Sequence, residues 1–318
     1  MDIILDIKKK KRKKPSVFSK MKKDTLIPYL FIMPWILGFL FFTLGPLLFS
    51  LVISFFDWPI IGNPTFVGLA NYKEMFFEDP QFWKSLGITA KFAGIFVPLN
   101  ISVALILALL LNNNVKGAGI FKTLFYMPSV ISGVALAMIW GWVYSDEYGI
   151  LNYFLSTIGI QGPNWLGDPN WATFAMVFAS VWGQGTMMLI FLAGLKNIPK
   201  ELYEAADIDG ANVFYKFMYI TLPMLSPTIL FNVITSIIGA FQQLSLALLL
   251  TGGGPVGSTY FYAMYVYDNA FKYFKMGYSA ANAWFMFLII LSLTLLVFKS
   301  SSMWVFYESE ATIKKKKG

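Results

Sequence analysis

The 318-residue sequence contains no cysteine and no histidine, and only 13% of its residues are charged. Without cysteine the chain has no disulfide framework, no thiol nucleophile and no thiolate metal site. Without histidine it also lacks the most common general base and metal ligand. No cluster of carboxylates replaces them. The sequence therefore predicts no catalytic residues and no metal site, and a chain that is not an enzyme by itself.

Apolar residues, in contrast, are abundant: they make up 57% of the chain, and the mean hydropathy is +0.62. This composition differs from that of ordinary soluble domains. The apolar residues form six blocks, each long enough to cross a hydrocarbon core of about 30 Å as a helix. Blocks that are apolar on all sides have no aqueous face. The sequence predicts an all-α integral membrane protein with six transmembrane helices, at Tyr29–Phe56, Leu86–Leu111, Gly119–Tyr144, Trp171–Leu195, Leu222–Leu250 and Tyr278–Phe298.

The basic residues are unevenly distributed between the two sides of these spans. One side holds most of them: Lys8 to Lys14 with Arg12, Lys20, Lys22, Lys23, Lys116, Lys122, Lys196, Lys200, Lys216, Lys299 and Lys314 to Lys317. The other side holds Lys73, Lys84, Lys272 and Lys275, with Lys91 just inside the second span. The positive-inside rule therefore places both termini in the cytoplasm. The external connection from Ser145 to Asn170 has Asp146, Glu147 and Asp168 but no Lys or Arg.

The basic pattern also suggests the domain organisation. We expect a cytoplasmic amino-terminal tail over 1–25, a membrane domain over 26–300 and a cytoplasmic carboxy-terminal tail over 301–318. A basic tail can bind nucleic acid, but beside a membrane span it is more typical of a topology signal that contacts anionic lipid headgroups. The apolar block after this tail is longer than a signal-peptide core of roughly 7–15 residues, so it is expected to remain as the first span.

The cytoplasmic loop at about 196–222 is polar and lies between two apolar blocks. Pro199 can begin a helix, and Glu201 near that end favours the helix dipole. Gly210 permits a turn, after which a second short helix is expected from Ala211 to about Tyr219. We expect a helix–turn–helix elbow whose Glu204, Asp207 and Asp209 meet basic groups on a partner. The alternative is a hairpin that only links two spans.

This loop also carries a recognisable pattern. Glu204, Ala205, Ala206, Gly210, Ile220, Leu222 and Pro223 match the signature of ABC importer permeases, and Asp209 fits its common form. Three further segments resemble the carbohydrate-uptake branch, which includes the larger maltose permease subunit and the glycerol-phosphate permease: residues 66–72, 121–128 and 250–255. The resemblance extends from about Thr25 to Glu308. It implies the type I ABC importer permease fold, with a cytoplasmic coupling helix that inserts into a groove on an ATPase.

The resemblance implies partners rather than cofactors. It predicts a second permease subunit, in a heterodimer, and two cytoplasmic ATPase subunits that bind ATP and Mg. It also predicts an extracellular or periplasmic solute-binding protein. The complex is expected at a bacterial cell membrane. The chain itself is expected to bind no ATP, because the glycine run from Gly252 to Ser258 lacks the lysine of a P-loop. The spans contain no Asp or Glu, which disfavours an ion-coupled secondary carrier.

The expected substrate is a sugar, with an oligosaccharide as its expected form. Sugars are usually held by aromatic faces together with amide and hydroxyl groups. An alignment with maltose-type permeases places the site at Trp182, Gly183, Thr186, Ser236, Gly239, Ala240 and Gln243, and the same polar stretches add Gln184 and Gln242. Small residues at Gly239 and Ala240 leave room for a bulkier glycan than maltose. The alternatives are polar residues that only bond helices together, and a permease for another solute such as glycerol phosphate.

Overall fold

The computed structural model of the protein describes residues 17–112 and 117–306. The basic residues Lys8 to Lys14, Lys116 and Lys314 to Lys317 lie outside these ranges. The predicted tails at 1–25 and 301–318 are therefore described only in part, and their boundaries stay predictions. The chain divides into two units, and the boundary between them in the sequence lies between Val52 and Ile53.

The first unit contains one long apolar helix. It consists of α1 (Val17–Phe39), the π-helical turn η1 (Leu40–Leu44) and α2 (Gly45–Ile53), of which Pro28–Ile53 is apolar enough to span a membrane. Pro46 has no N–H to continue the helical ladder. The turn just before it widens, and the Gly45 N–H bonds to the Leu40 carbonyl. The helix therefore changes locally before Pro46 without ending the first span.

The second unit begins with the first predicted external connection. Strands β1 (Phe56–Asp57) and β2 (Thr65–Phe66) pair antiparallel, and α3 (Ala70–Lys73) runs into the π-helical turn η2 (Glu74–Glu78). The side chain of Asp79 then caps the next helix, because its Oδ1 accepts from the Gln81 N–H at 2.8 Å. Its Oδ2 accepts from the hydroxyls of Tyr265 and Tyr278. Burial and the bond to Asp79 raise the pKa of Tyr265, so its hydroxyl stays a proton donor.

Among the described residues, four helices are long and apolar enough to span a membrane, and the number rises to six if each of two bent pairs is one span. The unbroken spans in the second unit are α4 (Pro80–Asn112), residues 213–241 and α15 (Met276–Trp304). One bent pair joins α5 (Ala118–Tyr126) and η3 (Met127–Val130) to α6 (Gly133–Val143) at 104°. The other joins α8 (Pro169–Trp182) to α9 (Gly185–Lys196) at 52°. The six predicted blocks thus correspond to these six elements.

Three of the predicted spans need correction. The block at Trp171–Leu195 is bent by 52° between α8 and α9. The block at Gly119–Tyr144 is not one straight helix, because the chain turns sharply after Pro128 and Ser132 caps a new helix by accepting from the Ala135 N–H. The block at Leu222–Leu250 ends at Phe241. Residues 242–244 break the helix before α13 (Ser245–Leu250). Apolar composition alone could not reveal any of these three breaks.

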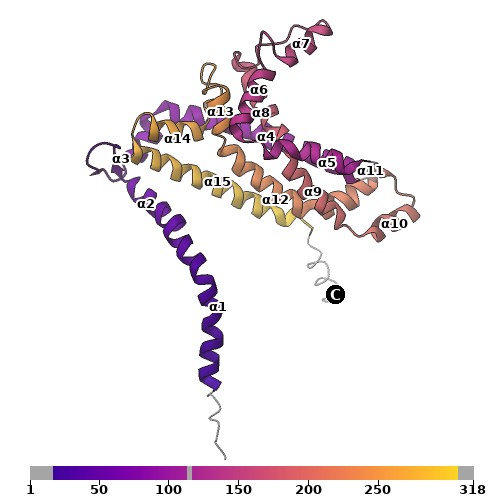
Figure 1. Ribbon diagram of the computed structural model, residues 1–318, viewed down its shortest axis with the longest axis horizontal. Helices are drawn as coiled ribbons and strands as arrows, with labels where there is room; N and C mark the ends of the chain where they lie inside the picture. Colours follow the sequence, from indigo (N-terminus) through magenta and orange to yellow (C-terminus); the bar gives the residue numbers. More distant parts are fainter. Residues whose placement is uncertain (1–16, 113–116, 307–318) are drawn as a thin grey trace, which may run out of the picture. The chain divides into compact units, whose positions relative to one another are not determined.

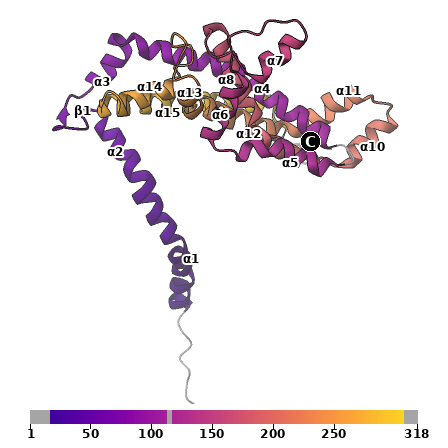
Figure 2. The ribbon, with the colours of Figure 1, turned by 45° about the horizontal axis from the view of Figure 1, so that its top comes forward.

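Helix α4 is central to the second unit and packs against α9 and against α12 (Leu222–Phe241). Helix α12 lies beside α15 (Figure 1, Figure 2). The interior has one apolar cluster around Phe92, Phe96 and Phe261 and another around Phe191 and Leu225. Helix α7 (Ile150–Thr157) lies in the predicted external connection, and α14 (Tyr262–Phe271) precedes the last span.

Candidate functional site

The elbow predicted at 196–222 begins with α10 (Lys200–Ile208), which starts directly after Pro199. Glu201 lies in its first turn, where a carboxylate interacts favourably with the positive end of the helix dipole. Glu204 and Ala205 are exposed, and Ala206 is half-buried. Glu204 and Ala205 of the family signature therefore face outward from a regular helix.

Gly210 ends this helix in a left-handed conformation, with φ of +75°. The Gly210 N–H bonds to the Asp207 carbonyl at 3.1 Å, and the Ala211 N–H bonds to the Ala206 carbonyl at 2.9 Å. These two bonds define a Schellman cap, which satisfies carbonyls that the helix end would otherwise leave open. Asp209 is the C-cap residue. The turn that the sequence predicts at Gly210 is confirmed, and its cause is this cap.

The second half of the elbow differs from the prediction. Asn212 caps α11 (Val213–Lys216) by accepting from the Tyr215 N–H at 3.0 Å. The helix does not end near Tyr219 but continues through the π-helical turn η4 (Phe217–Thr221) into α12. Leu222 and Pro223 are half-buried within this continuous helix. Motion of the elbow can therefore pass directly into a membrane span.

Two contacts hold the halves of the elbow together. Lys216 forms an ion pair with Asp207, and the Tyr203 and Thr221 hydroxyls lie 2.9 Å apart. Asp207 is thus engaged within the elbow, whereas Glu204 and Asp209 have no ion-pair partner in the described part of the chain. The elbow also exposes Ile208 (88%), Val213 (80%) and Phe214 (65%), which the sequence reasoning passed over. Exposed apolar side chains gathered on one loop indicate a protein-binding surface.

The carboxy-terminal end of α15 is hydrogen-bonded to the base of the elbow. Pro227 has no N–H, so the Pro223 carbonyl lacks its normal helical donor. The Ser226 hydroxyl donates to that carbonyl at 2.5 Å. Its Oγ in turn accepts from the Phe306 N–H at 2.8 Å. Ser226 is buried, and it joins the last span to the Leu-Pro end of the signature.

Replacing Ser226 with alanine is expected to lower the stability of this junction by about 1–3 kcal/mol, because it leaves the Pro223 carbonyl and the Phe306 N–H without partners. The thermal midpoint of the purified protein in detergent measures the effect. Ser85→Ala is the matched control, since that buried hydroxyl bonds only to the Phe82 carbonyl in its own helix. Equal midpoints for the two variants would contradict the assigned role of Ser226.

The predicted substrate residues on the fourth span surround its bend. Helix α8 ends at Trp182 and α9 begins at Gly185, with Gly183 and Gln184 between them. The Gln184 amide donates to the Ser180 carbonyl at 3.0 Å, and the Gln243 amide donates to the Ser180 hydroxyl oxygen at 2.9 Å. Ser180, near the bend of the fourth span, is therefore hydrogen-bonded to Gln243, in the non-helical segment that follows α12.

The structure divides the nine predicted substrate residues into two groups. The accessible residues are Trp182, Thr186, Gly239 and Gln242, which are exposed, and Gly183, Gln184 and Gln243, which are half-buried. Ser236 and Ala240 are buried instead. Ser236 accepts from the Asn100 amide at 3.1 Å. Ser236 thus has the helix-bonding role that was the alternative to substrate binding.

A cavity of about 420 Å³ lies beside the bend, lined mainly by apolar residues of α4, α5 and α8 together with Trp182 and Gln184. Trp140 also lines it, and its ring lies edge-on to Trp182 with centroids 5.8 Å apart. The Trp140 Nε1 is buried without a partner. Sequence reasoning missed Trp140 because it lies in a uniformly apolar block. No group of residues suited to hold a metal ion occurs in residues 17–112 or 117–306.

The glycine run after α13 forms consecutive turns rather than a phosphate loop. Gly252, Gly253 and Gly257 have positive φ, and Thr259 Oγ1 donates to the Gly254 carbonyl at 2.7 Å. No strand within the described ranges leads into it, and the next helix begins only at Tyr262. The segment therefore forms a compact connection between α13 and α14.

Comparison with known proteins identifies the family. Residues 100–303 match the family described as binding-protein-dependent transport system inner membrane component. The chain is 44% identical to the probable ABC transporter permease protein YesP of Bacillus subtilis, over 91% of this chain and 95% of YesP. It is 36% identical to the trehalose/maltose transport system permease protein MalF of Thermococcus litoralis, over 88% and 96% of the two chains.

The fold is also found among solved structures. A chain of the bacterial alginate ABC transporter, in complex with an alginate pentasaccharide-bound periplasmic protein, matches with a TM-score of 0.77 and 23% identity. The match covers 90% of this chain and 97% of that chain. With its apolar spans and signature elbow, the protein belongs to the family of binding-protein-dependent transport system inner membrane components, the multi-pass permease subunits of ABC transporters.

Proposed function

We propose that this permease carries a sugar, in the form of an oligosaccharide, into the cell by ATP-driven, binding-protein-dependent import. The main support is the elbow, because α10 exposes the first part of the signature, and the second half of the elbow continues as one helix from Val213 into the fifth span. The relative MalF is named as a trehalose/maltose permease, and the alginate transporter binds a pentasaccharide-loaded periplasmic protein. These names favour a saccharide over the alternative solutes.

The energy for import would come from two cytoplasmic ATPase subunits, which bind ATP and Mg. Glu204, Ala205, Ala206, Asp209 and Gly210 form the part of the elbow that would dock on an ATPase, and Leu222 with Pro223 would pass its displacement into α12. Closure of the ATPases would shift the permease between inward- and outward-facing states. A second, different permease subunit would complete the pathway, and a solute-binding protein would deliver the sugar from outside.

Reconstitution tests this proposal. The complete transporter with its binding protein should accumulate saccharide in proteoliposomes against a gradient when ATP is supplied. The same vesicles prepared without ATPase subunits should not. Sustained uphill uptake without them would refute the proposed coupling, and uptake of only a non-saccharide solute such as glycerol phosphate would refute the proposed substrate.

Trp182 and Gln243 are expected to contact the sugar, one through its aromatic face and the other through its amide. In the double variant Trp182→Ala, Gln243→Ala, substrate-stimulated ATPase activity should fall roughly tenfold, which corresponds to about 1.4 kcal/mol of lost interaction. Trp171→Ala is the control, since Trp171 lies on the same helix as Trp182 and is equally exposed (41%) but is not a predicted substrate residue. Unchanged stimulation in the double variant would reject the assignment.

A further inference from the structure

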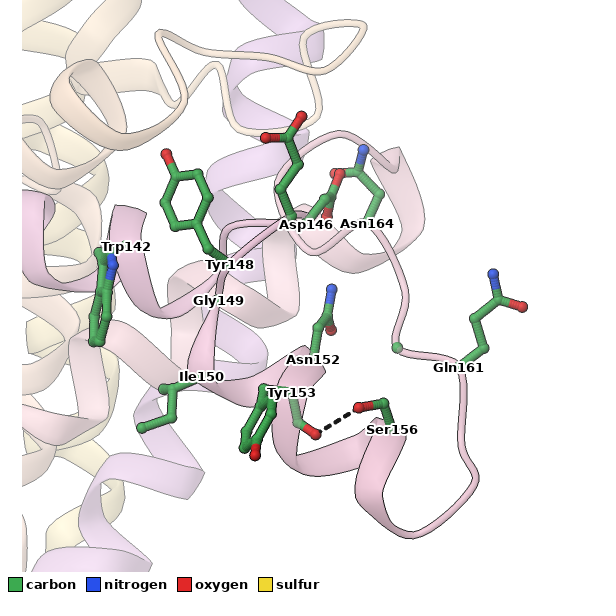
Figure 3. Close-up of a pocket in the computed structure, with 12 residues that line it drawn as sticks. Trp142, Asp146, Tyr148, Gly149, Ile150, Asn152, Tyr153, Ser156, Gln161 and Asn164 are labelled. Carbon is green, nitrogen blue, oxygen red and sulfur yellow. Dashed lines mark hydrogen bonds between the residues drawn. The ribbon is translucent and has the colours of Figure 1, made fainter.

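The predicted external connection between the third and fourth spans contains a pocket outside the membrane site. It has a volume of about 870 Å³, within the range of small-molecule sites. Trp142 at the end of α6 lines it, together with Tyr148 and with Tyr153 of α7. Figure 3 shows Asn152 and Tyr153 projecting from α7, whereas Gln161 and Asn164 belong to the segment that returns toward α8.

This pocket has a fixed frame. The Trp165 Nε1–H donates to Asn152 Oδ1 at 2.7 Å, which ties α7 to the returning segment. A Cβ on Gly162 would lie 2.0 Å from the same Oδ1, and a Cβ on Gly149 would lie 2.2 Å from the Ser145 carbonyl oxygen. Only glycine allows these close approaches. The walls are therefore preorganised, which reduces the entropic cost of binding a ligand.

The lining combines two kinds of group that saccharides require. Tyr148 and Tyr153 present rings that are 66% and 71% exposed, and such rings can stack on the C–H faces of a sugar. The Gln161 amide and the Asp146 and Glu147 carboxylates line the same pocket, and none of them forms a hydrogen bond or ion pair within the described chain. They are free to bond with sugar hydroxyls.

The charge of the connection limits the ligand further. Residues 145–170 include Asp146, Glu147 and Asp168 but no Lys or Arg. Phosphate groups of lipids and carboxylates of acidic sugars would be repelled there. The pocket is concave, carries negative charge and exposes aromatic rings. Neutral sugar units are therefore a better ligand for it than a membrane surface is.

The pocket also connects to the membrane interior through packed aromatic rings. Trp140 contacts both Trp182 at the bend and Tyr144, with centroids 5.8 Å and 4.9 Å apart. Tyr144 contacts Trp165, which in turn holds Asn152. The frame of the external pocket and the candidate membrane site are thus parts of one packed structure.

We propose that this pocket is a saccharide-binding subsite that holds one or two neutral sugar units on the external side before they reach the membrane interior. The proposal rests on the proposed sugar-import function, but it concerns a separate site. Tyr148 and Tyr153 would stack on the sugar. The carboxylates of Asp146 and Glu147 would accept hydrogen bonds from its hydroxyls, and the Gln161 amide would accept or donate them.

The test uses the complete transporter in lipid nanodiscs, without binding protein and without ATP. Saturation-transfer NMR is recorded with maltotriose and arabinotriose as neutral probes and trigalacturonate as the acidic probe. We expect saturable binding of a neutral probe, and an apparent Kd about tenfold higher in the double variant Tyr148→Ala, Tyr153→Ala, which corresponds to about 1.4 kcal/mol lost with the two rings. The Phe154→Ala variant should bind the probe as the unchanged protein does. It removes an exposed ring from α7, the helix that carries Tyr153, but Phe154 does not line the pocket.

Several outcomes would overturn the inference. They are no binding of either neutral probe, equal binding in the double variant and the unchanged protein, or preference for trigalacturonate. A double variant that keeps its sugar affinity but loses affinity for the sugar-free binding protein would show a protein-docking surface instead. Receptor-dependent uptake of sugar by the unchanged protein, measured in parallel, tests the proposed function separately. Normal uptake with no subsite binding would refute this inference alone.

Discussion

Replacing Gly210 with valine is expected to reduce ATP-driven transport by about tenfold or more. The residue has φ of +75°, and a β-branched side chain is strongly disfavoured there. The strain amounts to roughly 1–2 kcal/mol, and 1.4 kcal/mol corresponds to a tenfold change in population. The Schellman cap would open, and α10 would lose its fixed orientation toward the ATPase. Substrate-stimulated ATPase activity and uptake by the reconstituted transporter measure the loss.

Gly68 provides the matched control for this experiment. It also has positive φ (+57°) and, like Gly210, has open space where a Cβ would be added. Gly68→Val therefore introduces a comparable backbone strain on the predicted external side. If the two variants reach the membrane equally but lose transport to the same degree, the effect is general destabilisation, and the special role of the elbow is wrong.

Replacing Gly185 with alanine is expected to disrupt folding of the membrane domain. The added Cβ would lie 2.5 Å from the Tyr126 Cα and 2.6 Å from the Phe125 carbonyl oxygen. These are backbone atoms, so no side-chain rotation can relieve the overlap. The cost should reach or exceed the upper end of the roughly 1–3 kcal/mol typical of overpacking. The yield of monodisperse protein and its thermal midpoint in detergent measure this.

Gly183→Ala serves as the comparison, because a Cβ at that position would be 3.7 Å from its nearest neighbour, the Ser180 carbonyl oxygen. Both glycines lie at the same bend, so the pair separates close helix contact from loss of flexibility. Comparable destabilisation by both substitutions would show that the bend needs glycine for its conformation and not for the approach of α5.

Much of the fold could be predicted because a membrane imposes simple requirements on a sequence. Helices that cross the hydrocarbon must be long and apolar, so composition located all six spanning elements. The turn in the elbow could also be predicted, because it depends on local backbone chemistry. Gly210 was expected to turn because its lack of a Cβ permits positive φ, and the structure has φ of +75° there.

The candidate substrate site was less predictable. A polar residue in an apolar helix can face a pathway or bond to a neighbouring helix, and its own sequence does not distinguish these roles. Ser236 bonds to Asn100, which is far away in the sequence, whereas Gln243 and Gln184 meet at Ser180. Trp140 lines the cavity. It was missed because the sequence of a uniformly apolar block does not show which aromatic side chains line a cavity and which face lipid.

The sequence by itself determined the class of protein, its apolar spans, the expected sidedness of its loops and the signature elbow, because these depend on composition and on short-range backbone chemistry. Only the tertiary structure decided where the third, fourth and fifth spans break, that the elbow continues into α12, and that Phe306 is tied through Ser226 to Pro223. The bonds from Phe306 to Ser226 and from Gln243 to Ser180 join segments distant in the chain. Such contacts satisfy buried polar groups in ways that no single segment can specify.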